Sequence, residues 1–254
     1  MFNFGDSNSD TGNLVAGAGF RLHRPVGRRF FGKPSGRFSD GRLYIDFICE
    51  RLGLDHLSPY LESSGVSFRH GANFAVAGAM TGAGESSIVP AIVTRRIRNA
   101  LTMVHEAGGR KLVVYNTGPL GLTTRAASPA GHNRVARAFN ARLGRLCSDL
   151  RAELANATVV CVDMYAVKYG LFANHTEHAA DGVLRRAVQY NYEAGKACGS
   201  PKVKKACADG DRRIVWDGLH YTEAANRIVA DKVMSAEYSD PPLQLQTLCD
   251  SHRF

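Results

Sequence analysis

The sequence is 254 residues long, 44% hydrophobic and 22% charged, a composition typical of a globular protein with a sizeable core. Its formal net charge of +9 would favour anionic partners, but the basic residues are scattered and the densest basic patches lack interleaved aromatic side chains, so we predict no nucleic-acid partner. No stretch approaches the roughly 18 consecutive apolar residues of a membrane span, and the first residues lack the pattern of a signal peptide, so we expect neither feature in this chain.

Helical and strand-like patterns alternate along the chain. Apolar residues recur at helical spacing in three segments, 41–52, 91–107 and 135–154. Short apolar runs predict buried strands at 111–115, 158–162 and 213–216. A last helix is predicted to follow Thr222, whose hydroxyl suits a helix cap, whereas residues 175–212 have the least regular pattern and are expected to form a surface excursion.

This alternation predicts an α/β fold, a three-layer sandwich in which a central parallel sheet carries helices on both faces. In such sheets the active residues gather on loops at the carboxyl ends of strands. No internal repeat or low-complexity linker interrupts the chain, so residues 1–254 are predicted to form a single domain.

The first chemically informative segment surrounds Ser7. An apolar strand end at Phe4 leads into Gly5-Asp6-Ser7 and then into a polar run rich in Gly and Asn. A hydroxyl at this edge of a sheet lies near the start of the next helix, where backbone N–H groups can meet an oxyanion. On local features alone, however, the interpretation of Ser7 as a helix cap is favoured.

The second segment is Asp217-Gly-Leu-His220, directly before the last predicted helix. A serine needs a base to remove its proton, and a histidine is suited to that task near neutral pH. The histidine in turn needs an acceptor for its other ring nitrogen, which Asp217 supplies from the same turn. Taken alone, the pattern arises often by chance and is also explained as a turn.

The six cysteines permit disulfides without specifying them. Cys198 and Cys207 flank a polar loop where a bridge would be most useful, whereas Cys161 is interpreted as a buried strand residue. Glycosylation sequons at Asn156 and Asn174 favour a secreted ancestry.

Taken together, the segments around Ser7 and His220 resemble the GDSL esterase/lipase family of SGNH hydrolases, in particular its plant branch. The similarity extends over most of the chain and is carried by five blocks: Phe4-Gly-Asp-Ser-Asn-Ser-Asp-Thr-Gly-Asn13, Gly36-Arg-Phe-Ser-Asp-Gly-Arg42, Gly71-Ala-Asn-Phe-Ala-Val-Ala-Gly-Ala79, Asn116-Thr-Gly-Pro-Leu-Gly121 and Trp216-Asp-Gly-Leu-His-Tyr-Thr-Glu-Ala-Ala-Asn226. The resemblance implies the SGNH-hydrolase (flavodoxin-like) form of the α/β sandwich.

The resemblance also assigns roles to four residues. It implies Ser7 as the nucleophile, His220 as the general base and Asp217 as the residue that orients it. The N–H groups of Ser7 and Gly41 are implied as oxyanion donors, and a glycine lets the backbone approach the substrate closely. Asp10 and Asn13 resemble scaffolding of the nucleophile loop. No metal or cofactor is implied, and His175 and His178 lack the neighbouring ligands of a metal site.

The chain departs from the family pattern in one block. A Gly-x-Asn-Asp segment, which supplies an asparagine side chain to the oxyanion hole, is missing, and the domain is predicted to be incomplete at its amino end and between about residues 79 and 88. Loss of one such donor costs on the order of 100- to 1000-fold in turnover. Asn116 could substitute by position, although a turn-forming role beside Gly118-Pro119 is favoured.

Two hypotheses follow. The first is an ester hydrolase that acts on acetylated carbohydrate, small acyl or lipid esters through an acyl-enzyme on Ser7. The second is a catalytically impaired descendant that binds glycan or lipid, or a truncated product without function. The family implies an extracellular or secretory-pathway location and small-molecule or polysaccharide esters as partners; the oligomeric state is left open.

Overall fold

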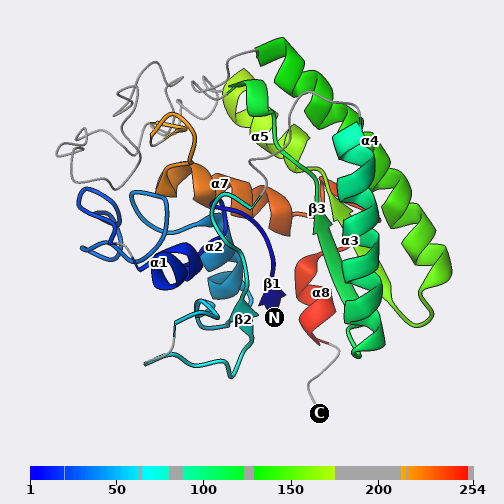
Figure 1. Ribbon diagram of the computed structural model, residues 1–254, viewed down its shortest axis with the longest axis horizontal. Helices are drawn as coiled ribbons and strands as arrows, with labels where there is room; N and C mark the ends of the chain where they lie inside the picture. Colours follow the sequence, from blue (N-terminus) through cyan, green and yellow to red (C-terminus); the bar gives the residue numbers. More distant parts are fainter. Residues whose placement is uncertain are drawn as a thin grey trace. The chain divides into compact units, whose positions relative to one another are not determined.

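The computed structural model describes residues 1–19, 21–62, 65–79, 88–122, 129–174, 213–215 and 217–250 (Figure 1). The chain divides into two compact units, which are treated separately below. The first comprises Met1–Gly82 and Leu171–Ala230, and the second comprises Ala83–Gly170 and Asp231–Phe254. The expected surface excursion at 175–212, the loop between Cys198 and Cys207 and the pair of His175 and His178 lie outside the described residues.

The first unit contains a two-stranded parallel sheet in which β1 (Phe2–Asn3) pairs with β2 (Ala72–Asn73). Its helices are α1 (Asn13–Ala18), α2 (Tyr44–Arg51) and most of α7 (Glu223–Met234). Helix α2 begins where the Asp46 carboxylate accepts the N–H of Leu43 at 2.8 Å, and it buries most of its apolar residues. Thr222 caps α7, as predicted, because its hydroxyl accepts the Ala225 N–H at 3.2 Å.

The second unit is built on a three-stranded sheet of order β3-β4-β5. Strands β3 (Lys111–Tyr115) and β4 (Thr158–Val162) are parallel, with Lys111 opposite Thr158, whereas the short β5 (Ser239–Asp240) runs antiparallel to β4. The remaining elements of the chain are α3 (Ile88–Glu106), the short 3₁₀ turn η1 (Leu120–Leu122), α4 (Pro129–Glu153), α5 (Met164–Ala173), which crosses the boundary between the units, and α8 (Leu245–Asp250).

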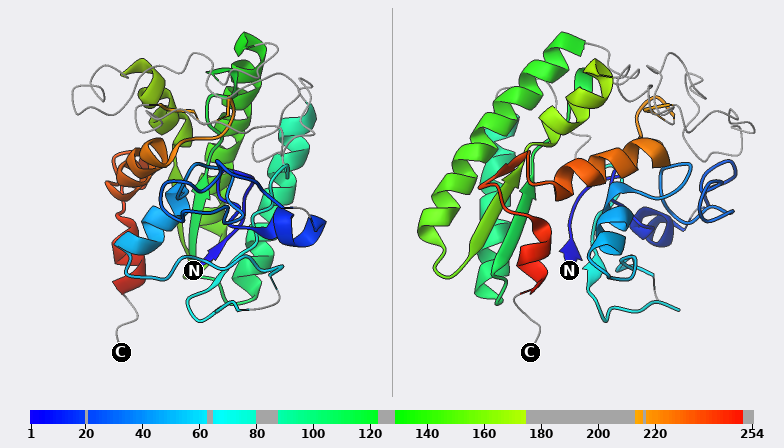
Figure 2. Two further views of the ribbon diagram at one scale, coloured as in Figure 1. Left: turned by 90° about the vertical axis from the view of Figure 1, so that its left-hand side faces the viewer. Right: turned by 180° about the vertical axis from the view of Figure 1, so that it is seen from behind.

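Helices cover both faces of this sheet. A core of buried residues from β3, β4 and α4 packs against partly buried apolar residues of α3, among them Ile97 and Leu101. Helix α8 lies on the opposite side of the strands from α3 and α4 in the two opposed views (Figures 1 and 2). The α/β class and the parallel pairing are therefore confirmed, and the predicted bounds of β3 and β4 match the observed ones.

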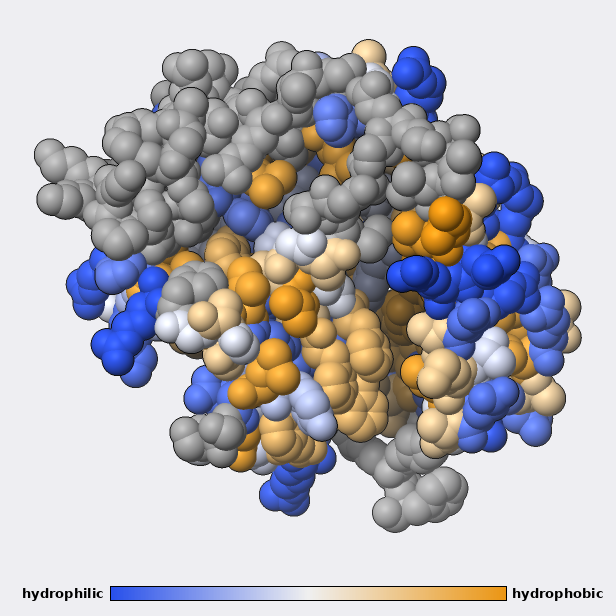
Figure 3. All heavy atoms as spheres, viewed as in Figure 1, coloured by the Kyte–Doolittle hydropathy of each residue, from blue (hydrophilic) through white to orange (hydrophobic). Residues whose placement is uncertain are grey.

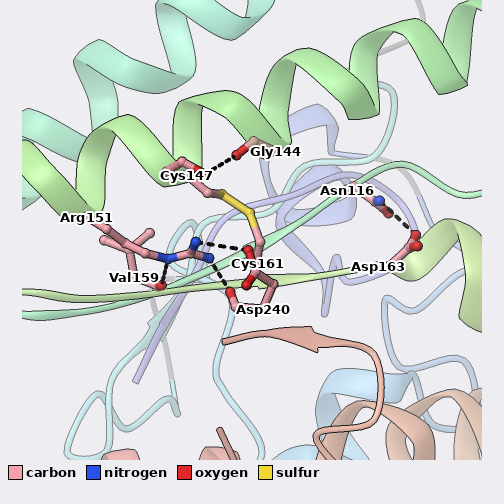
Figure 4. The surroundings of a disulfide bond; sticks show 9 residues. Asn116, Gly144, Cys147, Arg151, Val159, Cys161, Asp163 and Asp240 are labelled. Carbon is pink, nitrogen blue, oxygen red and sulfur yellow. Dashed lines mark hydrogen bonds and ion pairs between the residues drawn. A yellow bond between two sulfur atoms is a disulfide. The ribbon is translucent and has the colours of Figure 1, made fainter. Parts of the chain in front are cut away.

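A disulfide joins Cys147 of α4 to Cys161 of β4 (Figure 4). The interpretation of Cys161 as a simple buried strand residue was therefore incomplete. The outward pleat of β4 presents this side chain to the covering helix, where Cys147 is fully buried. Cys49 remains a free, buried thiol, and burial raises its pKa to about 12.

The prediction of a strand at 213–216 was wrong for its described part, 213–215. Val215 makes only an isolated antiparallel bridge with Tyr221. The turn at 217–220 reverses the chain soon after this segment, and the pairing across the turn is an isolated bridge instead of a strand ladder. Among the described helices, none is long and apolar enough to cross a membrane.

Candidate active site

Ser7 lies in a tight turn directly after β1. The N–H groups of Ser9 and Asp10 both donate to the carbonyl of Asp6, at 3.0 and 2.9 Å, and the Asp6 carboxylate accepts the N–H of Asn8 at 2.8 Å. These bonds close the chain around Ser7, whose side chain is half-buried. Gly5 packs closely against Ser9, because a Cβ at this position would lie 2.4 Å from the Ser9 hydroxyl oxygen in its observed rotamer.

The turn is held in place by Asp10, whose side chain is fully buried. Its carboxylate accepts four backbone N–H groups at 2.7–3.1 Å, from Gly12, Asn13, Leu14 and Ala77. A carboxylate that accepts this many backbone N–H groups fixes the backbone around it. The geometry agrees with a scaffolding role for Asp10.

Asn13 ties the same loop to the chain after β2. Its amide nitrogen donates to the carbonyls of Asn73 and Ala75 at 2.7 and 2.9 Å, and its oxygen accepts the N–H of Leu61 at 2.9 Å. The Asn73 side chain in turn donates to the carbonyl of Ser9 at 2.6 Å. The loop that carries Ser7 is therefore bonded to its own unit through side chains as well as through strand pairing.

Asp217 and His220 meet in the turn before α7. His220 Nδ1 lies 2.7 Å from Asp217 Oδ2, and the other carboxylate oxygen accepts the backbone N–H groups of Leu219 and His220 at 3.0 and 2.7 Å. Gly218 has φ 88°, a left-handed conformation that a glycine adopts without strain. Both side chains are buried, at 4% exposure for Asp217 and 7% for His220.

The electrostatics of this pair favour an ionised aspartate. Burial by itself would raise the pKa of Asp217, but the charge of His220 and the hydrogen bonds from His220 and Leu219 outweigh it and lower the pKa to about 2. An ionised carboxylate only accepts hydrogen bonds, so the proton of the neutral imidazole lies on Nδ1. The lone pair is then on Nε2, which is buried and has no hydrogen-bond partner within the described part of the protein.

Two observations relate the His220 turn to other parts of the first unit. The His220 ring lies 5.4 Å from the Phe38 ring, centroid to centroid. Burial together with the negative charge of Asp6 raises the pKa of the Tyr221 hydroxyl, so the residue before Ser7 lies within electrostatic range of the residue after His220.

Gly41 lies in the loop 39–42, directly before α2. Its N–H group is buried and is directed at the hydroxyl oxygen of Ser39, at the long distance of 3.3 Å. The Glu223 carboxylate passes so close that a Cβ on Gly41 would lie 1.8 Å from one of its oxygens. Gly41 is thus a glycine because of a close approach.

The four predicted site residues, Ser7, Gly41, Asp217 and His220, all belong to the first unit. A hydrogen bond joins Asp217 to His220 directly. The loop of Gly41 is also hydrogen-bonded to the residues after His220, through side chains that were not among the predicted site residues. Ser39 and Glu223 are two of them.

Asn116, the candidate substitute oxyanion donor, belongs to the second unit. Its amide nitrogen donates to Asp163 Oδ1 at 2.9 Å (Figure 4). Its amide oxygen accepts the N–H of Tyr165, also at 2.9 Å. Both ends of the amide are therefore engaged in joining the end of β3 to the start of α5, which supports the turn-forming interpretation.

The second unit has a groove of about 420 Å³ between α3 and α4. Arginines dominate its lining, namely Arg95, Arg98, Arg142 and Arg145. Hydrophilic side chains gather over these helices on the right of the space-filling view (Figure 3). None of the predicted site residues lines the groove. The described residues also contain no group of three or more His, Cys, Asp or Glu side chains placed to hold a metal ion.

Comparison with known proteins identifies a family for most of the chain. The sequence model of the GDSL-like lipase/acylhydrolase family matches two segments, residues 1–88 and 87–233. GDSL esterase/lipase At1g09390 of Arabidopsis thaliana is 36% identical, covering 98% of this chain and 90% of the relative. GDSL esterase/lipase LIP-4 of the same plant is 34% identical, over 98% and 89%. GDSL esterase/lipase ACHE of Zea mays is 32% identical, over 99% and 89%.

Proposed function

The chain belongs to the GDSL-like lipase/acylhydrolase family, and on this premise we propose that it hydrolyses carboxylic esters with Ser7 as nucleophile. One observation carries the proposal. The Nε2 atom of His220 is buried without a hydrogen-bond partner in the described structure, while its Nδ1 is held by an ionised Asp217. Activation of a serine requires that one imidazole nitrogen is held by a carboxylate while the other accepts the hydroxyl proton, and no group of the described residues competes with the serine for Nε2.

The proposed reaction has two steps. His220 Nε2 removes the Ser7 proton as Oγ attacks the ester carbonyl, and it then protonates the departing alcohol to leave an acyl-enzyme. Water, deprotonated by the same nitrogen, releases the acid and regenerates Ser7. The N–H groups of Ser7 and Gly41 stabilise the tetrahedral oxyanion, and Gly41 exchanges its long bond to Ser39 for this stronger one.

We also propose that an internal segment of the family domain is absent between about residues 79 and 88. Two findings support this. The family model matches in two pieces that meet at residues 87–88, and the alignment with the relative from Arabidopsis extends over 332 positions although this chain has 254 residues. In addition, Phe2 and Phe4 of the β1 segment are 68% and 63% exposed, whereas strands of parallel sheets are normally covered on both faces.

Acetylated carbohydrates, small acyl esters and lipid esters are the substrate classes that we propose. The test is a rate measurement on p-nitrophenyl esters of increasing chain length and on an acetylated oligosaccharide. Ser7→Ala and His220→Ala are compared with Ser148→Ala, which removes an exposed hydroxyl of the second unit. We expect activity in the wild type and in Ser148→Ala only. Rates at the uncatalysed background in all four proteins would instead support the catalytically impaired descendant.

We further propose passage through the secretory pathway. The Cys147–Cys161 disulfide is typical of an oxidising compartment. The sequon residue Asn156 is exposed in the turn between α4 and β4, where a glycan would meet no packed surface.

A further inference from the structure

Two loops distant in sequence are joined by hydrogen bonds in the first unit. One is the loop 39–42, which contains Gly41, and the other is the segment 221–226, which follows His220 directly. The Ser39 hydroxyl donates to the carbonyl of Tyr221 at 3.1 Å. The buried Asp40 carboxylate accepts the first N–H of α7, that of Glu223, at 2.8 Å.

Glu223 makes several contacts across this junction. One of its carboxylate oxygens accepts the backbone N–H of Arg42 at 2.9 Å, and the other accepts the Arg42 guanidinium at 2.8 Å. The carboxylate lies directly over Gly41, in the space that a Cβ would occupy. Glu223 therefore fixes the peptide that links Gly41 to Arg42. One carboxylate oxygen accepts the N–H of this peptide, and the carboxylate packs against the Cα of Gly41.

Arg42 is itself held by contacts with two rings and a second carboxylate. Its guanidinium lies 4.1 Å from the Phe30 ring centroid and 4.3 Å from that of Phe47, and it is also bonded to Glu50. Although burial disfavours its charge, the hydrogen bonds that Arg42 donates to Glu223 and Glu50 raise the pKa of Arg42. The carboxylate of Glu223 is thus bonded to an arginine whose guanidinium also contacts Phe47 and Glu50 of α2.

From these contacts we propose that Glu223 is a positioning residue, which holds the Gly41 N–H at a fixed place relative to His220. The inference rests on the proposed function, in which Gly41 stabilises the oxyanion and His220 transfers the proton. Glu223 is the first residue of the helix that follows His220, and its side chain is bonded to the loop that contains Gly41. A displacement of either loop is therefore transmitted to the other. The same contact explains why residue 41 carries no side chain.

The test compares Glu223→Ala and Glu223→Gln with Glu237→Ala. The control removes an exposed glutamate beyond the end of the same helix, whose ion pair is with Lys232 at 3.5 Å. Ester hydrolysis gives kcat and KM for each protein. We expect Glu223→Ala to lower kcat by about 100-fold, the cost of one misplaced oxyanion donor, with KM within about twofold of the wild type. Glu223→Gln keeps an acceptor oxygen over Gly41 and should recover most of kcat, and Glu237→Ala should match the wild type.

A second measurement does not depend on turnover. The amide resonance of Gly41, followed by ¹H–¹⁵N NMR, should shift in Glu223→Ala and stay in place in Glu237→Ala. If Ser7→Ala is inactive but Glu223→Ala keeps the kcat of the control, the positioning role is wrong and the proposed function stands. If Ser7→Ala is as active as the wild type, the proposed function fails, and an unshifted Gly41 resonance in Glu223→Ala then overturns the positioning role as well. Should Glu223→Ala not fold, Glu223→Asp replaces it in both comparisons, because the side chain shortened by one methylene group withdraws the carboxylate from Gly41 and Arg42 and should also lower kcat and shift the Gly41 resonance.

Discussion

The imidazole of His220 is bonded to Asp217 through Nδ1 at 2.7 Å, while its Nε2 is buried and has no hydrogen-bond partner in the described structure. Two backbone N–H groups of the same turn donate to the other oxygen of Asp217. The carboxylate therefore organises the turn and orients the ring at once. The effects expected of a substitution at Asp217 follow from these two roles.

Asp217→Asn should abolish most ester hydrolysis while leaving the fold intact. The amide has the same shape and still accepts the backbone N–H groups through its oxygen, but its nitrogen faces His220 Nδ1 and favours the wrong tautomer. In a serine hydrolase triad this change costs about 10⁴-fold in kcat. The measurement is kcat on a p-nitrophenyl ester, with circular dichroism to confirm folding. A variant with near wild-type kcat would show that His220 does not act through Asp217.

Acid stability should depend on the same residue. The pKa of Asp217 is about 2 in the folded protein and near the ordinary 3.8 in the unfolded chain, so between these values the unfolded state binds more protons. The stabilisation is thus fully present above about pH 4 and is lost as the pH falls towards 2. Urea unfolding of the wild type and Asp217→Asn at a series of pH values should show a stability difference that shrinks over this window. A difference that stays constant down to pH 2 would contradict the lowered pKa.

The sequence predicted those parts of the fold that local patterns determine. The strands at 111–115 and 158–162 were placed correctly because each is an apolar run with β-branched residues, bounded by polar turns. The cap at Thr222 followed from its residue type and position. The roles of Ser7, Asp217, His220 and Gly41 came from motifs, and they stay predictions.

Contacts between distant segments could not be predicted in the same way. Glu223 and Arg42 are 181 residues apart, and nothing in either local pattern indicates that one carboxylate covers Gly41 and bonds to its neighbour. Cys147 lies in a helix and Cys161 in a strand, so only the packing of α4 on β4 brings them together. The apolar run at 213–216 predicts a strand, whereas the structure has an isolated bridge between Val215 and Tyr221. An apolar run does not indicate how soon the chain reverses.

Arg37→Met should destabilise the first unit strongly. The guanidinium of Arg37 is bonded to both carboxylate oxygens of Asp46, at 2.7 and 2.8 Å, and both side chains are buried. Burial disfavours the charge of Asp46, but Arg37 outweighs this and lowers its pKa, so removing the arginine leaves an uncompensated buried charge. The expected loss is about 3–5 kcal/mol. Urea denaturation measures it.

The control for this variant is Arg98→Met. Arg98 also pairs with two carboxylates, of Asp149 and Glu153, but all three side chains are substantially exposed. Its loss should cost less than about 1 kcal/mol. Equal losses in the two variants would show that burial of the Arg37 pair does not determine its contribution.

Reduction of the Cys147–Cys161 disulfide should destabilise the second unit. The bond closes a loop with a sequence separation of 14 residues, which contains the end of α4 and the turn into β4. Closing a loop of this size stabilises a fold by about 3 kcal/mol. Dithiothreitol should therefore lower the urea midpoint of the wild type, and the double variant Cys147→Ala, Cys161→Ala should start at the lower midpoint. If dithiothreitol lowers the midpoint of that variant equally, the stabilisation comes from elsewhere.

Asn156 should carry a glycan when the protein is made in a plant secretory system. It is exposed and takes a positive φ of 58° in the turn between α4 and β4, which presents its side chain to solvent. The Arg151 side chain in the last turn of α4 donates to the carbonyl of Val159 and so connects the two ends of this turn (Figure 4). A glycan on Asn156 would therefore add mass without disturbing the pairing of β3 with β4. Treatment with an N-glycosidase should lower the apparent mass of the wild type by one glycan more than that of Asn156→Gln, since the sequon at Asn174 remains in both. Identical shifts in the two proteins would show that Asn156 is not modified.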